Sequence, residues 1–284
     1  MFKRIKILLD MIKFEHTVFA LPFAYLGAFL AAQGLPPLRE SLLILLGMVG
    51  GRTAAMGFNR IVDLPFDAKN PRTKDRPLVT GAVKDKEAWA MVIISGAIFF
   101  LAAYLLNPLA FKLSPWVFFV LLAYSYTKRF TPLCHIFLGF AIGIAPTAGW
   151  IAVKGSVSTV PILISIGVLF WVAGFDILYA CLDTEFDKRE GLHSIPSAIG
   201  VRRAFFVSAA FHAVAFFIFL LVGIMAHLGL AYYIGLVGVS ALFILQRRVV
   251  SPEDLSRMNL AFFTLNGLVS LILFCFTAID LLIF

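Results

Sequence analysis

The chain has 284 residues, of which 61% are hydrophobic, and its formal net charge at pH 7 is +8. A mean hydropathy of +0.95 excludes a soluble globular domain and predicts a polytopic helical membrane protein. The basic excess is explained by loop residues on one side of a membrane and their attraction to anionic lipids, so no nucleic acid partner is indicated.

Two regions are expected along the chain. Residues 1–15 interleave basic and apolar side chains, which predicts a short amphipathic helix lying at the cytoplasmic interface. Residues 16–284 are expected to form a single transmembrane domain, an all-α bundle of nine helices. The fourth predicted span is the shortest. The nine spans are 16–32, 41–62, 88–106, 114–127, 133–153, 160–182, 204–223, 226–246 and 259–283.

Loop charges predict the orientation of this bundle. With the N-terminus in the cytoplasm, the loop lysines and arginines lie on the cytoplasmic side except for Arg39, Lys112 and Lys154. This excess of basic residues on one side of the membrane follows the positive-inside rule. It predicts a cytoplasmic N-terminus, with both long polar loops, 63–87 and 183–203, in the cytoplasm. A bacterial or archaeal inner membrane is expected for this integral protein, and an organellar membrane is the alternative.

Acidic and amide side chains recur near the ends of two spans. On a helix, Asn59, Asp63 and Asp67 would spread over about 80° of the surface, and Asp176, Asp183 and Asp187 over about 40°. Two facing acidic stripes repel each other unless cations lie between them, and such oxygen ligands suit Mg²⁺. Three helices separate the two spans, so the stripes have the same orientation. This suggests two parallel pseudo-repeats with a cytoplasmic-facing site.

Basic residues adjoin both stripes. They are suited to the oxygens of a diphosphate bridged by Mg²⁺, although each also fits an ordinary positive-inside loop. Tyr179 is a further candidate for a phosphate or an aromatic hydroxyl, with a buried structural tyrosine as the alternative. The basic candidates for diphosphate binding are Lys69, Arg72, Lys74, Arg76, Lys128, Arg129 and Lys188.

Two charged residues are predicted deeper in the bundle. Arg52 lies seven residues before Asn59 on the same face, where it would either fork the carboxylate of an acceptor or pair internally with an acid. Asp176 lies two turns above Asp183, which favours a role as a base over metal binding.

The histidines, His135 among them, form no ligand pattern and are assigned to packing or interfacial roles. Small residues of the fifth span predict close helix packing and a groove for a long apolar chain, lined by aromatic rings.

The two polar segments resemble the signatures of a known family. NRIVDLPFDAKNPRTKDRPL at 59–78 and DILYACLDTEFDKREGLHSIP at 176–196 are similar to the two aspartate motifs of the UbiA superfamily of intramembrane aromatic prenyltransferases. RTAAMGFNR at 52–60 is most similar to the 4-hydroxybenzoate polyprenyltransferases and their menaquinone-pathway relatives.

This resemblance implies specific roles. Metal and prenyl diphosphate would be held by Asn59, Asp63, Asp67, Asp183 and Asp187, with Asp176 beside the aromatic acceptor. The implied activity is Mg²⁺-dependent transfer of a polyprenyl group to a ring carbon of 4-hydroxybenzoate or a dihydroxynaphthoate in quinone biosynthesis. The haem- and chlorophyll-prenylating branches stay open at this point. A secondary transporter that couples cations through carboxylates is the alternative from another class.

Overall fold

A computed structural model describes residues 2–12 and 20–283, and none of these residues lies in a β-strand. In this part of the chain eight helical segments are long and apolar enough to cross a membrane. They are α3 (Leu38–Asp67), α4 (Asp85–Leu106), α5 (Pro108–Thr127), α6 (Cys134–Lys154), α7 continued into α8 (Thr159–Glu190), α10 (Val201–Met225), α11 (Leu230–Val249) and η3 with α12 (Leu260–Ile283).

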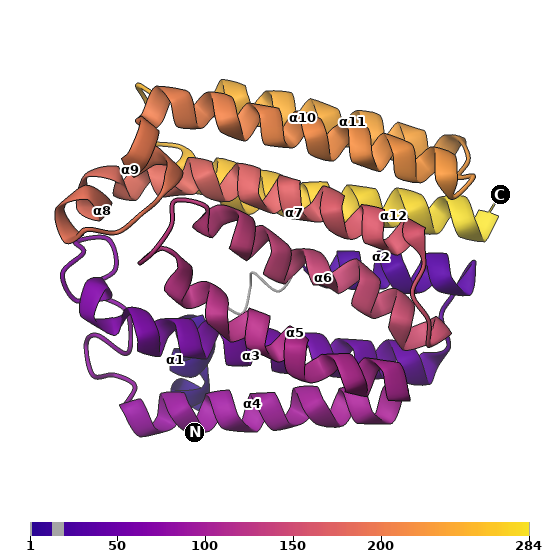
Figure 1. The fold of residues 1–284 in the computed structure, drawn as a ribbon, viewed down its shortest axis with the longest axis horizontal. Coiled ribbons are helices and arrows are strands. Elements are labelled where there is room, and N and C mark those ends of the chain that lie inside the picture. Colours follow the sequence, from indigo (N-terminus) through magenta and orange to yellow (C-terminus); the bar gives the residue numbers. More distant parts are fainter. Residues whose placement is uncertain (1, 13–19, 284) are drawn as a thin grey trace.

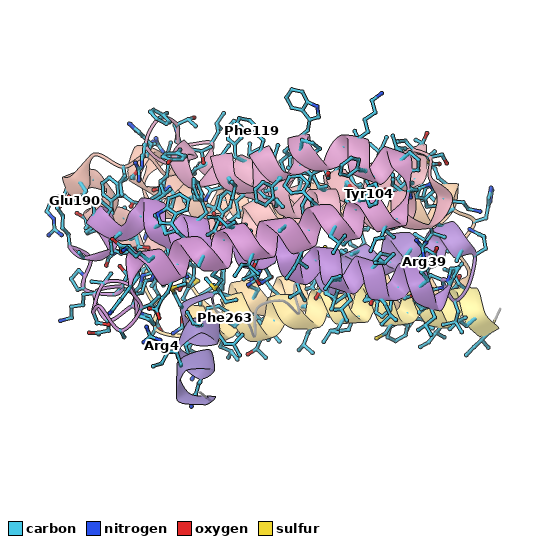
Figure 2. The ribbon with its side chains drawn as sticks, turned by 90° about the horizontal axis from the view of Figure 1, so that it is seen from below. Arg4, Arg39, Tyr104, Phe119, Glu190 and Phe263 are labelled. Carbon is cyan, nitrogen blue, oxygen red and sulfur yellow. The ribbon has the colours of Figure 1, made fainter. Side chains whose placement is uncertain are left out.

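The N-terminal region contains two shorter helices. α2 spans Leu21–Ala32, and the start of the predicted span 16–32 lies outside the described residues, so the count of nine spans stays a prediction. α1 spans Phe2–Ile12 and projects from the bundle near Arg4 (Figure 2). An ion pair joins Arg4 to Glu87 of α4, and Met11 is buried against the loop before α4. The interfacial position of α1 stays a prediction.

The long helices lie side by side (Figure 1), with α10 and α11 along one side of the bundle and α4 along the other. The end of α3, α8 (Thr184–Glu190) and α9 (Ile195–Ile199) gather at one end of the molecule, and the C-terminus lies at the opposite end. Both long polar loops therefore meet at the same end. Which side of the membrane this end faces, and the two pseudo-repeats, stay predictions.

α7 forms the centre of the largest apolar core. Trp171 of α7 is fully buried and packs against Phe23 of α2, with the ring centroids 5.1 Å apart. The small residues of α6 permit the predicted close approach. A Cβ atom added to Gly149 would lie 1.9 Å from the carbonyl oxygen of Ala24, so α2 and α6 pack backbone to backbone there. Large side chains such as Phe119 face outward, as expected for contact with lipid.

Two elements differ from the sequence prediction. α5 begins at Pro108 rather than at 114, because the Asn107 side chain accepts a hydrogen bond from the Ala110 amide and proline fits the first turn of a helix. The second acidic stripe does not lie on one regular helix, which corrects the prediction. α7 ends at Ala180, the 3₁₀ turn η2 covers Cys181–Asp183, and α8 begins at Thr184. The Thr184 hydroxyl donates to the Cys181 carbonyl oxygen at 3.0 Å and supports this tighter turn.

Candidate active site

The first acidic stripe lies on the last turns of α3, as predicted. α3 continues as a helix through Pro65 to Asp67, so three residues spaced four apart share one face. Asn59 Nδ2 donates to Asp63 Oδ2 at 3.0 Å, and Asp63 is 5% exposed. The cations nearest to Asp63 come from the end of α5: Lys128 Nζ is 3.6 Å away and an Arg129 guanidinium nitrogen 3.9 Å away. Lys128 and Arg129 therefore join the stripe, as the sequence predicted.

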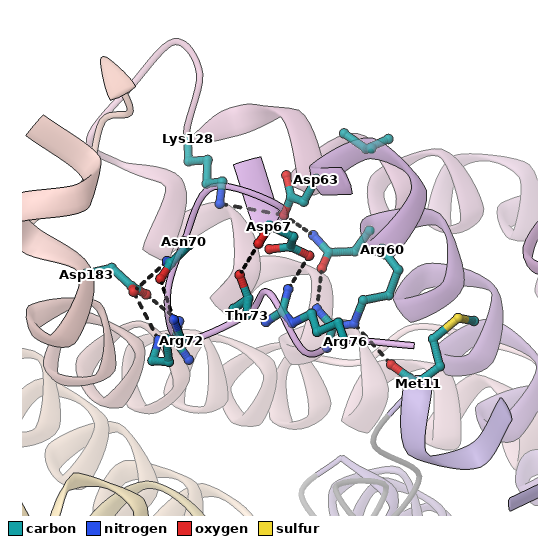
Figure 3. Close-up of polar contacts among 12 residues, drawn as sticks. Met11, Arg60, Asp63, Asp67, Asn70, Arg72, Thr73, Arg76, Lys128 and Asp183 are labelled. Carbon is teal, nitrogen blue, oxygen red and sulfur yellow. Dashed lines mark hydrogen bonds and ion pairs between the residues drawn. The ribbon is translucent and has the colours of Figure 1, made fainter. Parts of the chain in front are cut away.

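A buried arginine, Arg60, orients the Asn59 side chain of the first stripe. Arg60 Nε donates to the carbonyl oxygen of Met11, near the end of α1, at 3.0 Å (Figure 3). Its NH1 group donates to Asn59 Oδ1 at 3.3 Å. Because the Asn59 oxygen accepts from Arg60, the amide nitrogen points to Asp63. The sequence analysis left Arg60 without a role, since a contact with a backbone carbonyl has no side-chain signature.

The loop after α3 folds back on the stripe. Arg76 pairs with Asp67, and the Thr73 hydroxyl donates to the Asp67 carbonyl oxygen at 3.0 Å. Asp67 is buried, and the end of α3 is thus fixed by its own loop (Figure 3).

The same loop bridges the two acidic stripes. Asn70 Nδ2 and Arg72 Nε each donate to Asp183 Oδ1 at 3.0 Å, and a second Arg72 nitrogen pairs with the other Asp183 oxygen. Arg72 NH1 also donates to the Tyr179 hydroxyl at 2.8 Å. The guanidinium carbon lies 4.9 Å from the centroid of the Tyr179 ring, which packs against Phe262 in a tilted arrangement. Burial alone would lower the pKa of Arg72, but its hydrogen bond and charge attraction with Asp183 raise it above the ordinary value, so Arg72 stays charged.

Lys128 lies between the two stripes. Its ammonium group is close to Asp63 and interacts electrostatically with Asp187, which is 7% exposed. Its carbonyl oxygen accepts from the His193 amide at 2.7 Å, which ties the second polar loop to the end of α5. Asp63 and Asp187 thus approach one shared cation.

Three predicted diphosphate ligands lie apart from this cluster. Lys69 is exposed and pairs with Glu190 at 2.7 Å, and Lys188 pairs with its exposed neighbour Glu185 at 3.6 Å. Lys74 is exposed on the loop surface. The structure therefore does not pair these three lysines with the aspartates of the two stripes.

Asp176 has a partner that the sequence analysis missed. His135 Nδ1 lies 2.7 Å from Asp176 Oδ2, and the amide of Ile195 donates to His135 Nε2 at 3.2 Å. His135 is buried, as a packing role would require, but its contact with Asp176 was not part of that assignment. Its position at the start of a helix was visible, but a pairing over 41 residues was not.

An apolar cavity of about 260 Å³ lies among α2, α3, α4, α5 and α6. Arg52 and Tyr124 line it, together with small and aliphatic side chains, and Phe99 is the other aromatic residue in its wall. The expected groove for an apolar chain therefore has mainly aliphatic rather than aromatic walls. Asp176 is not among the lining residues, so Arg52 and Asp176 are not placed together by this cavity.

The acid–base cluster offers oxygen donors of the kind that a divalent cation binds. It consists of Asn59, Asp63, Asp67, Asp183 and Asp187 together with Arg72, Arg76 and Lys128. Within residues 2–12 and 20–283 no three acidic, histidine or cysteine side chains already form a metal-binding group, and arginine side chains pair with Asp67 and Asp183. However, no described residue donates a hydrogen bond to Asp63 Oδ1, which is buried. Such an oxygen suits a hard cation, and an Arg129 guanidinium nitrogen lies 3.9 Å from it.

The fold and the site together are those of an integral membrane protein with an acid–base cluster beside an apolar cavity. Residues 20–268 match the UbiA prenyltransferase family, and the chain belongs to this family. It is therefore a prenyltransferase, as the two motifs indicated.

Relatives and solved structures agree with this assignment. The chain is 34% identical over 257 residues to a 4-hydroxybenzoate octaprenyltransferase from Aromatoleum aromaticum. The aligned region covers 90% of this chain and 86% of the relative. A UbiA homologue from Aeropyrum pernix, solved in its apo form, is 38% identical with a TM-score of 0.86, over 94% of this chain and 98% of the homologue. The Archaeoglobus fulgidus homologue bound to GPP and Mg²⁺ shares the fold at 22% identity, with a TM-score of 0.74 over 95% and 98% of the two chains.

Proposed function

We propose that this protein transfers a polyprenyl group from a polyprenyl diphosphate to a ring carbon of a hydroxylated aromatic acid, 4-hydroxybenzoate or a dihydroxynaphthoate, in quinone biosynthesis, with Mg²⁺ as its cofactor. The named relatives act on 4-hydroxybenzoate, which supports an acid acceptor over the haem and chlorophyll branches.

One observation carries the proposal: the acid–base cluster adjoins the apolar cavity. Tyr124 lines the cavity, and Lys128, four residues further along the chain and directly after the end of α5, approaches Asp63 of the cluster. Four helical residues correspond to about 6 Å. A molecule with a diphosphate head and an apolar tail fits this combination, because the head meets cations and the tail leaves water.

At the polar end, the chain's own cations would hold the diphosphate. Arg72 and Arg76 have planar guanidinium groups that match phosphate oxygens, and Lys128 adds a point charge between the stripes. These groups stabilise the charge that grows on the diphosphate as its bond to the allylic carbon breaks. When bound, Mg²⁺ supplies further positive charge to the same oxygens, and it would be held by Asn59, Asp63, Asp67, Asp183 and Asp187.

At the apolar end, the cavity walls exclude water from the electron-deficient allylic carbon. Arg52, in the cavity wall, would fork the carboxylate of the acceptor. A ring carbon then forms the new carbon–carbon bond, and the ring proton leaves to a base. Asp176 does not line this cavity, and it is the proposed base because 22% of its side-chain surface is accessible to an acceptor that extends beyond the cavity.

Transfer to an acceptor can be measured directly. Membranes containing the protein are incubated with radiolabelled polyprenyl diphosphate, Mg²⁺ and a panel of 4-hydroxybenzoate and dihydroxynaphthoates, and the lipid extract is examined. Membranes with the double variant Asp67→Asn and Asp187→Asn are the control. We expect an acceptor-dependent, labelled aromatic product only with the wild-type protein. The absence of such a product for every acid in the panel would refute the proposal.

A further inference from the structure

His135 occupies a position between three segments of the site. It lies in the first turn of α6, and only 2% of its side chain is exposed. One ring nitrogen contacts Asp176 of α7, and the other contacts the first residue of α9, Ile195. Both nitrogens of this imidazole are therefore engaged, each with a different segment.

The two contacts define where the ring carries its hydrogen. The amide of Ile195 can only donate, so His135 Nε2 must present a lone pair to it. The hydrogen then lies on Nδ1 and points to Asp176 Oδ2, 2.7 Å away. This is the tautomer that satisfies both contacts. The backbone of the second polar loop thus sets the direction of the hydrogen bond that Asp176 receives.

The bond to His135 also distinguishes the two oxygens of Asp176. Oδ2 accepts from the imidazole, while 22% of the Asp176 side chain stays accessible. A hydrogen bond to one carboxylate oxygen restricts rotation about the Cβ–Cγ bond, and it therefore narrows the directions in which the other oxygen can point. A proton acceptor needs such a restricted direction, since a misplacement of about 1 Å can cost roughly 100-fold in rate.

We propose that His135 is a positioning residue: through its Nδ1 hydrogen bond it fixes the Asp176 carboxylate so that Oδ1 faces the aromatic acceptor. The inference rests on the proposed function, in which Asp176 takes the ring proton. It adds to that function a group that acts through Asp176 and does not itself contact the substrate. A merely structural His135 would instead serve through its bond to the Ile195 amide, as a cap for α9.

Two substitutions separate these roles. In asparagine the amide nitrogen is as many bonds from Cα as Nδ1 is in histidine, so His135→Asn keeps a donor for Asp176 and loses the contact with Ile195. In glutamine the amide oxygen corresponds to Nε2, so His135→Gln keeps an acceptor for the Ile195 amide and loses the donor for Asp176. The pair thus removes one contact at a time.

The experiment measures kcat and both KM values in proteoliposomes, with thermal unfolding in detergent as the check on folding. We expect His135→Gln to lower kcat by roughly 100-fold with the KM for prenyl diphosphate unchanged, and His135→Asn to restore most of kcat. In an Asp176→Asn background, His135→Gln should cause no further loss. His227→Asn, on the exposed turn after α10 at the end away from α9, is the control.

The outcomes distinguish failure of this inference from failure of the function. If the wild-type protein prenylates the aromatic acid but His135→Gln turns over as fast as His135→Asn or faster, His135 does not position Asp176 and the inference is overturned. If the losses in kcat of His135→Gln and Asp176→Asn add independently, it is overturned as well. If the wild-type protein makes no prenylated acid, the proposed function itself fails.

Discussion

Replacing Arg72 with lysine tests whether the fork that joins the two stripes matters for catalysis. Arg72 makes a two-pronged contact with Asp183 and a third hydrogen bond with the Tyr179 hydroxyl. Lysine keeps the positive charge, but its single ammonium group cannot reach all of these acceptors in the planar arrangement of a guanidinium. The substitution therefore removes the planar guanidinium contact with Asp183 and Tyr179 and keeps the positive charge.

The expected size of the effect follows from the hydrogen bonds that lysine cannot make. We expect Arg72→Lys to keep one bond to Asp183 and to forgo the second bond to Asp183 and the bond to Tyr179. Each of these two bonds is worth about 1 kcal/mol. Because 34% of the Arg72 side chain is exposed, solvent screening reduces the total to about 1–2 kcal/mol. This range corresponds to a fall of roughly 5- to 30-fold in kcat/KM for prenyl diphosphate.

The assay is initial-rate kinetics with varied prenyl diphosphate at saturating acceptor. Arg202→Lys is the matched control, because Arg202 also pairs with a carboxylate, Glu253, but with 84% and 62% of the two side chains exposed. We expect this control to stay within about twofold of wild type, as exposed ion pairs contribute little. If Arg72→Lys is indistinguishable from Arg202→Lys, the fork does not organise the site and the reasoning fails.

Three further predictions concern the acidic stripes, the orientation in the membrane and Arg52. Asp67→Asn and Asp187→Asn should each severely reduce turnover, with partial rescue by raised Mg²⁺ in the milder variant; full activity at ordinary Mg²⁺ would exclude their role. Single cysteines near Lys84 and near Gly191, in a background without the native cysteines, should react only with reagents on the cytoplasmic side, and labelling from outside intact cells would contradict the orientation. Arg52→Ala, in protein shown to be folded, should raise the acceptor KM by an amount worth about 2 kcal/mol and leave the KM for prenyl diphosphate nearly unchanged. An unchanged acceptor KM would make Arg52 structural.

Local spacing made part of the site predictable. Asn59, Asp63 and Asp67 are four residues apart, and a spacing close to the helical repeat places them on one face as soon as the segment is helical. Lys128 and Arg129 follow a span of the same bundle, so they reach the same end of the molecule as the stripe. These inferences needed only the helical period and the alternation of spans.

Other parts of the site depend on tertiary packing, which the sequence alone does not reveal. His135 and Asp176 pair over 41 residues, and Asn70 reaches Asp183 over 113 residues. Asn70 could have been suspected, since it is an amide in the polar loop directly after the first stripe. No apolar periodicity predicts the 3₁₀ turn at Cys181–Asp183, because this turn comes at the end of the span.

The most direct test of the central claim is the stoichiometry of the reaction in purified, reconstituted protein. Diphosphate release and prenylated acid are quantified together, the acid by mass spectrometry, with polyprenyl diphosphate, 4-hydroxybenzoate and Mg²⁺ present. The account predicts one diphosphate released for each acid that gains a prenyl group on its ring, and no turnover after chelation of Mg²⁺. Diphosphate release without a prenylated acid, or prenyl transfer at an undiminished rate without a divalent cation, would contradict it.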